Sequence, residues 1–210
     1  MAAYAAATAT TASFETIRDA ATSGQGEKPS KTTTQPYREI LERLWIVDPL
    51  PAWLPSRNRL NRLAQAPKHH LADPALAVRI LGLDAEALLS GGEPNLPIPR
   101  DGRLLGHLFE SLVTLNVRVY AQAAEARVSH LRLHGGRREV DLIVERADQR
   151  VLAIEVKLSG AVDDDDVKHL TWLKEQIGDE LLDAVVIHTG PQAYRRRDGI
   201  AVVPAALLGA

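Results

Sequence analysis

Cysteine is absent from this chain of 210 residues. Disulfides, thiolate zinc sites and cysteine nucleophiles are therefore excluded, and because the absence suits a reducing compartment we expect a cytoplasmic protein. The start Met-Ala-Ala-Tyr-Ala-Ala-Ala-Thr has no basic residue and is rich in alanine and threonine, unlike a signal peptide. Long hydrophobic runs are missing too, so we expect no membrane-spanning segment.

An excess of positive charge is also missing. The chain carries 25 basic and 27 acidic side chains, so no broad positive field indicates binding to nucleic acid. Any contact with phosphate must then come from local clusters. Two such clusters lie at residues 57–62 and 195–197, although solvated surface charge explains both of them better.

A phosphate-binding loop of the form Gly-x-x-x-x-Gly-Lys-[Ser/Thr] is absent as well. Gly24, Gly26 and Lys28 do not have its spacing, so we expect no ATP binding. What is present is an ordinary globular composition, with 45% hydrophobic residues. A chain of this length can form one medium domain, or a small domain beside a larger one.

The most informative stretch is a pair of alternating segments within residues 138–158. Both segments are rich in β-branched residues, which predicts two strands. The polar sequence Ala-Asp-Gln at 147–149 separates them and predicts a hairpin turn. One face of each strand is apolar, and the opposite faces carry Asp141 on the first strand and Glu155 and Lys157 on the second.

The register of this hairpin decides whether the charged side chains meet. A three-residue turn at 147–149 places Asp141 opposite Glu155, and Glu139 opposite Lys157. A two-residue turn would place Asp141 opposite Val156 and destroy the apolar face of the hairpin. The hydrophobic pattern therefore selects the three-residue turn, with both carboxylates on one face.

Two carboxylates directly opposite each other on a sheet repel and lower its stability. A divalent cation bound between Asp141 and Glu155 would remove this conflict, and the nearby ammonium group of Lys157 would reduce it. The pattern therefore indicates a site for Mg²⁺ or Mn²⁺. The alternative is a solvent-facing hairpin with ordinary surface charges.

An aspartate followed, one strand later, by Glu-x-Lys resembles the core of the PD-(D/E)xK nuclease-like superfamily. The sequences Gly-Arg-Arg-Glu-Val-Asp-Leu-Ile-Val at 136–144 and Ile-Glu-Val-Lys at 154–157 are similar to the nuclease-like C-terminal domain of the DUF4143 type. That domain is found behind AAA-type ATPase domains in many bacterial and archaeal proteins. The stretch 41–53, ending Pro-Leu-Pro-Ala-Trp, resembles the winged-helix segment that precedes it.

The resemblance implies a mixed α/β fold with a restriction-endonuclease-like αβββαβ core. The order of elements predicted from the residues agrees, because a helix from about residue 102 to 123 is followed by three strands, a helix and two strands. We expect a mixed sheet that is covered by helices on both faces.

Ahead of this core the resemblance implies a small winged-helix-like unit. We place this unit at residues 1–66 and the nuclease-like domain at residues 67–210. Trp45, Leu50 and Trp53 are expected to pack the unit on the larger domain. The helix that ends near Trp45 has few basic residues, so contact with protein explains it better than insertion into a DNA groove.

The resemblance also implies hydrolysis of phosphodiester bonds in nucleic acid, with DNA as the expected partner. Asp141, Glu155 and the carbonyl of Val156 would bind Mg²⁺ or Mn²⁺ through oxygen. Lys157 would orient the attacking water and stabilise developing charge on the phosphate. Glu110 occupies the position of a helical glutamate that commonly completes the acidic cluster in such folds; an ordinary surface glutamate explains it equally well.

A second interpretation is a non-catalytic module that binds DNA or protein, or that regulates an AAA-type ATPase partner. The presence of all four charged site residues argues against a decayed enzyme. The near-neutral net charge and the missing ATPase sequence favour the module. The chain would then be a truncated piece, or a natural stand-alone version, of the C-terminal part of such an ATPase.

Overall fold

The structure of the chain is a computed structural model. It describes all residues except 24–27, 55–65, 97, 99–102, 134 and 210. The basic cluster at 57–62 therefore lies outside the described residues. Among those that are described, no helix is long and apolar enough to cross a membrane.

Internal contacts divide the chain into two compact units. Unit 1 comprises Met1–Leu50 and Ala66–Leu112, and unit 2 comprises Pro51–Gln65 and Val113–Ala210. This division differs from the boundary expected at residue 66. The reason is that the segment after residue 66 pairs with the N-terminal stretch, through bridges of Thr10 with His69 and of Leu50 with Lys68.

Unit 1 consists of short helices around two small apolar cores. The helices are α1 (Ala2–Ala6), α2 (Phe14–Ala21), α3 (Lys31–Arg43), α4 (Pro74–Ile80), α5 (Ala85–Leu89) and the start of α6 (Leu104–Ala123). One core joins alanines of α1 to Ile17 and Ile98, and the other joins Val47 and Leu71 to α4 and α6. Both cores therefore draw on sequence from either side of residue 66.

The expected packing of Trp45 on the larger domain stays a prediction, and the structure leaves its side chain exposed. The apolar side chains of α3 and its C-terminal end are exposed, with Tyr37, Ile40, Leu44 and Trp45 at 67%, 52%, 62% and 71%. The helix ends at Arg43, and the chain turns at Trp45 with a positive φ of 57°, which ends the helical periodicity before the indole. Leu50 and Trp53 are buried as expected, Leu50 in unit 1 and Trp53 in unit 2.

Unit 2 is built on a mixed sheet of six strands in the order β1-β2-β3-β4-β6-β5. The strands are β1 (Arg127–Arg132), β2 (Glu139–Glu145), β3 (Val151–Lys157), β4 (Leu181–His188), β5 (Tyr194–Arg195) and β6 (Ala201–Pro204). The first three are antiparallel, β4 and β6 continue parallel to β3, and β5 returns antiparallel. The mixed α/β class predicted from the sequence is confirmed.

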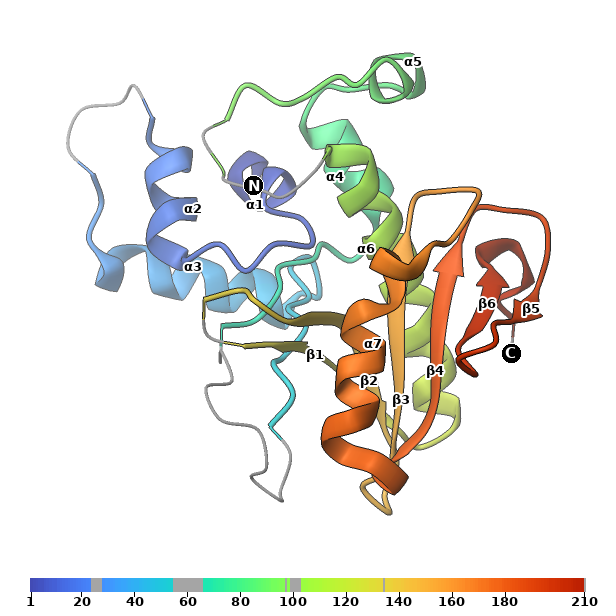
Figure 1. The fold of residues 1–210 in the computed structure, drawn as a ribbon. Coiled ribbons are helices and arrows are strands. Elements are labelled where there is room, and N and C mark those ends of the chain that lie inside the picture. Colours follow the sequence, from blue (N-terminus) through green and yellow to red (C-terminus); the bar gives the residue numbers. More distant parts are fainter. Residues whose placement is uncertain (24–27, 55–65, 97, 99–102, 134, 210) are drawn as a thin grey trace. The chain divides into compact units, whose positions relative to one another are not determined.

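Helices lie on both faces of this sheet. α7 (Asp164–Ile177) packs in front of it, and the part of α6 after Leu112 lies behind (Figure 1). Apolar residues of α7 form the core with the inner strands: Val167, Leu170, Leu173 and Ile177 from the helix, and Ile143, Val151, Ala153 and Val186 from the sheet. The crossover through α7 joins the parallel strands β3 and β4, which sets the end of β3 beside the start of α7. After β6 the chain forms the short 3-10 helix η2 (Ala205–Leu207).

Candidate functional site

The β2–β3 hairpin has the predicted three-residue turn. The Arg146 amide donates a hydrogen bond to the Arg150 carbonyl at 3.0 Å, which closes the turn. The paired positions run from Glu145 with Val151 to Leu142 with Ile154. Carried one step further, this register would place Asp141 opposite Glu155, but that pair is not among the paired positions.

The ladder between β2 and β3 stops just before the two carboxylates. The last paired positions are Leu142 and Ile154. In an antiparallel pair, every second residue of a strand directs its N–H and C=O groups to the same neighbouring strand. Val156 lies two residues after Ile154, so its N–H would be expected to bond to the backbone of β2. Instead, the Val156 amide donates to Oδ2 of Asp141 at 2.9 Å. A carboxylate therefore replaces a main-chain acceptor at the point where the hairpin opens.

A β-bulge accounts for this opening. The pairing of β1 with β2 shifts between Ser129–Ile143 and Leu131–Val140, so that His130 alone faces both Asp141 and Leu142. An extra residue in one strand bends it and redirects its side chains. The bulge therefore lies at Asp141 and Leu142, where the ladder between β2 and β3 ends.

Glu155 is a buried carboxylate with two basic side chains near it. Its exposed fraction is 4%. Lys157 Nζ lies 3.7 Å from Oε2, and His169 Nδ1 lies 3.7 Å from Oε1. Lys157 Nζ is also 3.9 Å from Oδ1 of Asp166. Burying a carboxylate is costly unless charges or hydrogen bonds offset it, and the Lys157 ammonium group offsets part of that cost here.

His169 was not anticipated from the sequence. Burial lowers the pKa of its imidazole, a hydrogen bond to the Glu139 backbone opposes this, and the positive charges of Arg138, Lys168 and Lys157 lower it further. The ring is therefore neutral at neutral pH. The only sequence signal was that Asp166 and His169 lie three residues apart on one helix, and this says nothing about which strand they contact.

Glu110 lies on α6 in unit 1, whereas Asp141 and Glu155 lie in unit 2. Its Oε1 accepts a hydrogen bond from Lys68 Nζ at 2.8 Å, and this lysine is only 1% exposed. The structure thus pairs Glu110 with a buried cation of its own unit. Its membership of the acidic cluster stays a prediction.

The oxygen atoms at the opened hairpin suit a small, hard cation. Among the residues described, no group of three or more His, Asp or Glu side chains is arranged to hold a metal ion. Two carboxylates and a backbone carbonyl are still a sufficient donor set for Mg²⁺, which keeps several of its waters. Because the Val156 N–H points toward Asp141, the Val156 carbonyl is directed to the same side.

The other charge clusters have structural explanations. The acidic run at the start of α7 forms a capping box, in which Asp163 accepts from the amides of Asp165 and Asp166. The run therefore forms the N-terminus of α7. Arg195 pairs with Asp183 at 2.8 Å, and Arg196 pairs with Asp164 and Asp198. These ion pairs support the explanation of the cluster at 195–197 as surface charge.

Residues 105–208 match the family model of a domain of unknown function, DUF4143. This match includes Glu110 and all the residues of the opened hairpin. It confirms the expected resemblance to the DUF4143 domain. Residues 1–87 match a second model, a domain of unknown function called DUF8612. No curated protein matches the chain.

A solved structure similar to the chain is a refined half-complex from the tetradecameric assembly of Thermococcus gammatolerans McrB AAA+ hexamers with bound McrC. It is 11% identical, has a TM-score of 0.35, and is matched over 97% of this chain and 68% of its own.

Proposed function

We propose that the chain is a metal-dependent nuclease that hydrolyses phosphodiester bonds of nucleic acid, with DNA as its expected substrate. The observation that carries the proposal is the opened hairpin. Asp141 leaves the ladder to meet the Val156 amide at 2.9 Å, beside the buried Glu155 and Lys157. Burying the Glu155 carboxylate, which is 4% exposed, lowers the stability of the fold, so a functional role explains the cluster better.

Asp141, Glu155 and the Val156 carbonyl would hold Mg²⁺ or Mn²⁺. When bound, this ion would polarise the phosphate and lower the pKa of a bound water. Lys157 lies between Glu155 and Asp166, at 3.7 and 3.9 Å, and its ammonium group would contact a phosphate oxygen. Neutral His169 lies 3.7 Å from Glu155 and would help to orient that carboxylate. Glu110 would complete the acidic cluster.

The test is cleavage of single-stranded and duplex DNA, and of RNA, with Mg²⁺, with Mn²⁺ and with chelator. We expect divalent-dependent cleavage that falls at least about a hundredfold in Asp141→Asn and in Lys157→Gln. Asp148→Asn is the matched control, because Asp148 lies in the turn of the same hairpin and pairs only with Arg146 and Arg150. Cleavage that survives chelation, or that Asp141→Asn leaves intact, would overturn the proposal.

One observation favours the second candidate, a non-catalytic module for binding DNA or protein. Lys157 lies within 4 Å of both Glu155 and Asp166, so the cluster is partly neutralised without any metal ion. Calorimetric titration with Mg²⁺, comparing the natural chain with Asp141→Ala, separates the two candidates. Absence of both metal binding and cleavage would favour the module, for which an AAA-type ATPase is the proposed partner.

A further inference from the structure

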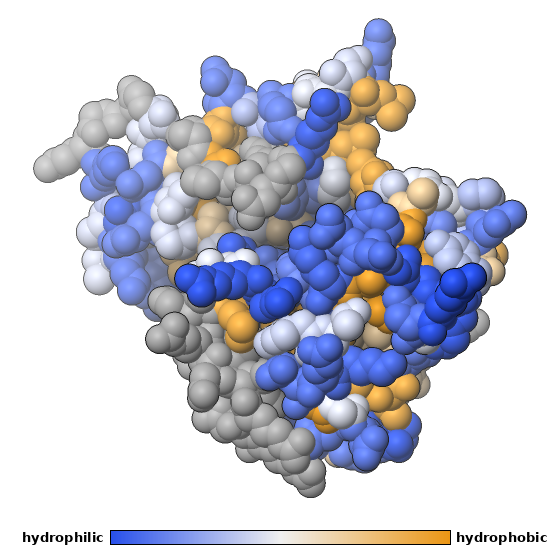
Figure 2. All heavy atoms as spheres, viewed as in Figure 1, coloured by the Kyte–Doolittle hydropathy of each residue, from blue (hydrophilic) through white to orange (hydrophobic). Residues whose placement is uncertain are grey.

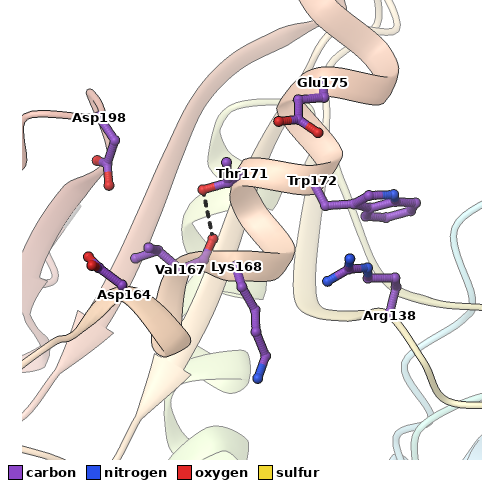
Figure 3. Close-up of a pocket in the computed structure, with 8 residues that line it drawn as sticks. All are labelled: Arg138, Asp164, Val167, Lys168, Thr171, Trp172, Glu175 and Asp198. Carbon is purple, nitrogen blue, oxygen red and sulfur yellow. Dashed lines mark hydrogen bonds between the residues drawn. The ribbon is translucent and has the colours of Figure 1, made fainter.

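A shallow hollow of about 460 Å³ lies on the outer side of α7. Its lining comes from α7, from the turn before β2 and from the loop before β6: Arg138, Asp164, Val167, Lys168, Thr171, Trp172, Glu175 and Asp198 (Figure 3). The surrounding face is mainly hydrophilic (Figure 2). Its volume is within the range of small-molecule and nucleotide sites, and all of it belongs to unit 2.

The charges of the hollow are separated. Asp164 and Asp198 lie together at one side, where Arg196 pairs with both of them. The opposite side carries Arg138 and Lys168 (Figure 3). Among the described residues, no carboxylate forms an ion pair with Arg138, and Lys168 has only an exposed pair with Asp165 at 3.5 Å. That side therefore presents two cations to an anionic ligand.

The Trp172 ring also lines the hollow and lies beside Arg138 (Figure 3). Trp172 is half-buried; part of it packs on the core of unit 2, and part of it lines the hollow. The Arg138 guanidinium carbon is 5.8 Å from the centre of the ring. An indole that is fixed on one side and open on the other is a surface on which a nucleobase can stack, with arginine contributing charge.

Neighbouring residues of unit 2 link the hollow to the opened hairpin. Arg138 precedes Glu139, whose backbone bonds to His169, and Lys168 precedes His169 in α7. His169 in turn lies 3.7 Å from Glu155. A chain of contacts within unit 2 therefore leads from the two cations to the carboxylates.

We propose that this hollow binds an unpaired nucleotide of the substrate, next to the phosphate that is cleaved. Its base stacks on Trp172, and its phosphate contacts Arg138 and Lys168. In a duplex both faces of each base are covered by neighbouring bases, so a base can reach Trp172 only from a single strand, a flap or a frayed end. The position of this nucleotide next to the cleaved phosphate rests on the proposed nuclease function. The binding of an unpaired nucleotide in the hollow does not depend on that function.

The first test is binding of a labelled single-stranded oligonucleotide and of a blunt duplex, without divalent ions. We expect the single strand to bind more tightly, Trp172→Ala to weaken it about tenfold, and Trp172→Phe to restore most of the affinity. Trp45→Ala is the matched control, because Trp45 is 71% exposed but lies in unit 1. Equal binding of both nucleic acids, or unchanged affinity in Trp172→Ala, would overturn the proposal.

The second test uses Arg138→Gln, with Arg137→Gln as its control. Both arginines lie in the turn before β2, but only Arg138 lines the hollow. We expect Arg138→Gln to weaken binding of the single strand several-fold more than Arg137→Gln does. Inorganic polyphosphate is the competitor. Polyphosphate could displace the single strand fully while Trp172→Phe and Trp172→Ala leave its affinity unchanged. That result would show an anion site without stacking and would refute the base-stacking role.

Tryptophan fluorescence reports on stacking directly. Oligo(dT) should quench the natural chain and Trp45→Phe, whereas Trp172→Phe should lose the quenching. If single strands bind through Trp172 but no DNA is cleaved, the subsite stands and the nuclease proposal fails. If DNA is cleaved and Trp172→Ala cleaves and binds as the natural chain does, the nuclease proposal stands and the subsite fails.

Discussion

Asp141 shows how one side chain can serve both fold and site. Its Oδ2 accepts the Val156 amide, which would otherwise lack its acceptor on β2. Because a buried N–H without an acceptor lowers stability, the carboxylate contributes to the fold while it stands beside Glu155. An asparagine could keep this hydrogen bond but would remove the charge, so the two contributions can be separated.

We therefore expect Asp141→Asn to raise the melting temperature of the metal-free protein slightly and to abolish its response to Mn²⁺. In the natural chain, millimolar Mn²⁺ at pH 7 should raise the melting temperature by about 2–4 °C for each kcal/mol of binding free energy. The rise should be small at pH 4, where protons compete for the carboxylate oxygens. Scanning calorimetry at both pH values checks this, and a natural chain indifferent to Mn²⁺ would contradict it.

His69 makes the stability of unit 1 depend on pH. Burial lowers the pKa of its imidazole, although a hydrogen bond to the Ala12 carbonyl opposes the shift. The unfolded chain therefore takes up a proton near pH 6.5, before the folded chain does. The free energy of unfolding should be fully present above this pH and should fall as the pH drops toward 5.

Substituting His69→Gln should remove part of that fall. Urea denaturation at pH 7.5 and at pH 5, followed by circular dichroism, measures the difference for the natural chain and for the variant. Glutamine can still donate to the Ala12 carbonyl but does not titrate. A pH dependence that is identical in the two proteins would show that other groups are responsible.

At the scale of elements, α7 links the core to the site. Its inner face packs on the sheet, while its first turns supply Asp166 and His169 to Glu155 and Lys157. Its N-terminus is fixed by Asp163, whose Oδ1 accepts from the amides of Asp165 and Asp166. The positions of the α7 side chains at the site therefore depend on this cap.

Replacement of the cap should loosen the helix and the site together. We expect Asp163→Ala to lower the free energy of unfolding by about 1 kcal/mol and to reduce any nuclease activity. Asp165→Ala is the control, because its carboxylate is 89% exposed and pairs only with Lys168. Urea denaturation and hydrogen exchange at the start of α7 measure both effects. Equal losses in the two variants would assign the effect to negative charge near the helix terminus rather than to the cap.

At the scale of the whole molecule, the net charge of −2 leaves binding to nucleic acid dependent on a few local cations. If Lys157, Arg138 and Lys168 make the phosphate contacts, the logarithm of affinity for a single strand should fall with the logarithm of salt concentration with a slope of about −2. Arg138→Gln should reduce the steepness by about 0.7. Titration between low and physiological salt checks this, and a much steeper slope would indicate that other basic residues bind.

The sequence by itself determined the local structure of the hairpin. Side chains alternate strictly along a strand, so the apolar pattern of β2 and β3 was enough to select the three-residue turn, and the pairing of Glu145 with Val151 confirms that turn. The long helix, the three strands and the capped helix that follow were predictable for the same reason, because the period of the pattern differs between helix and strand. The identity of the metal and of the substrate remains a prediction at this level.

Only the tertiary structure decided which distant elements meet. The approach of His169 to Glu155, the bulge that opens the hairpin, and the hollow at Trp172 all require α7, β1 and the β2–β3 hairpin to be packed together. The tertiary structure likewise decided that Trp45 is exposed and that residues 66–112 belong to unit 1. Periodicity shows which face of an element is apolar, but the partner of that face is chosen by the free energy of packing the whole chain.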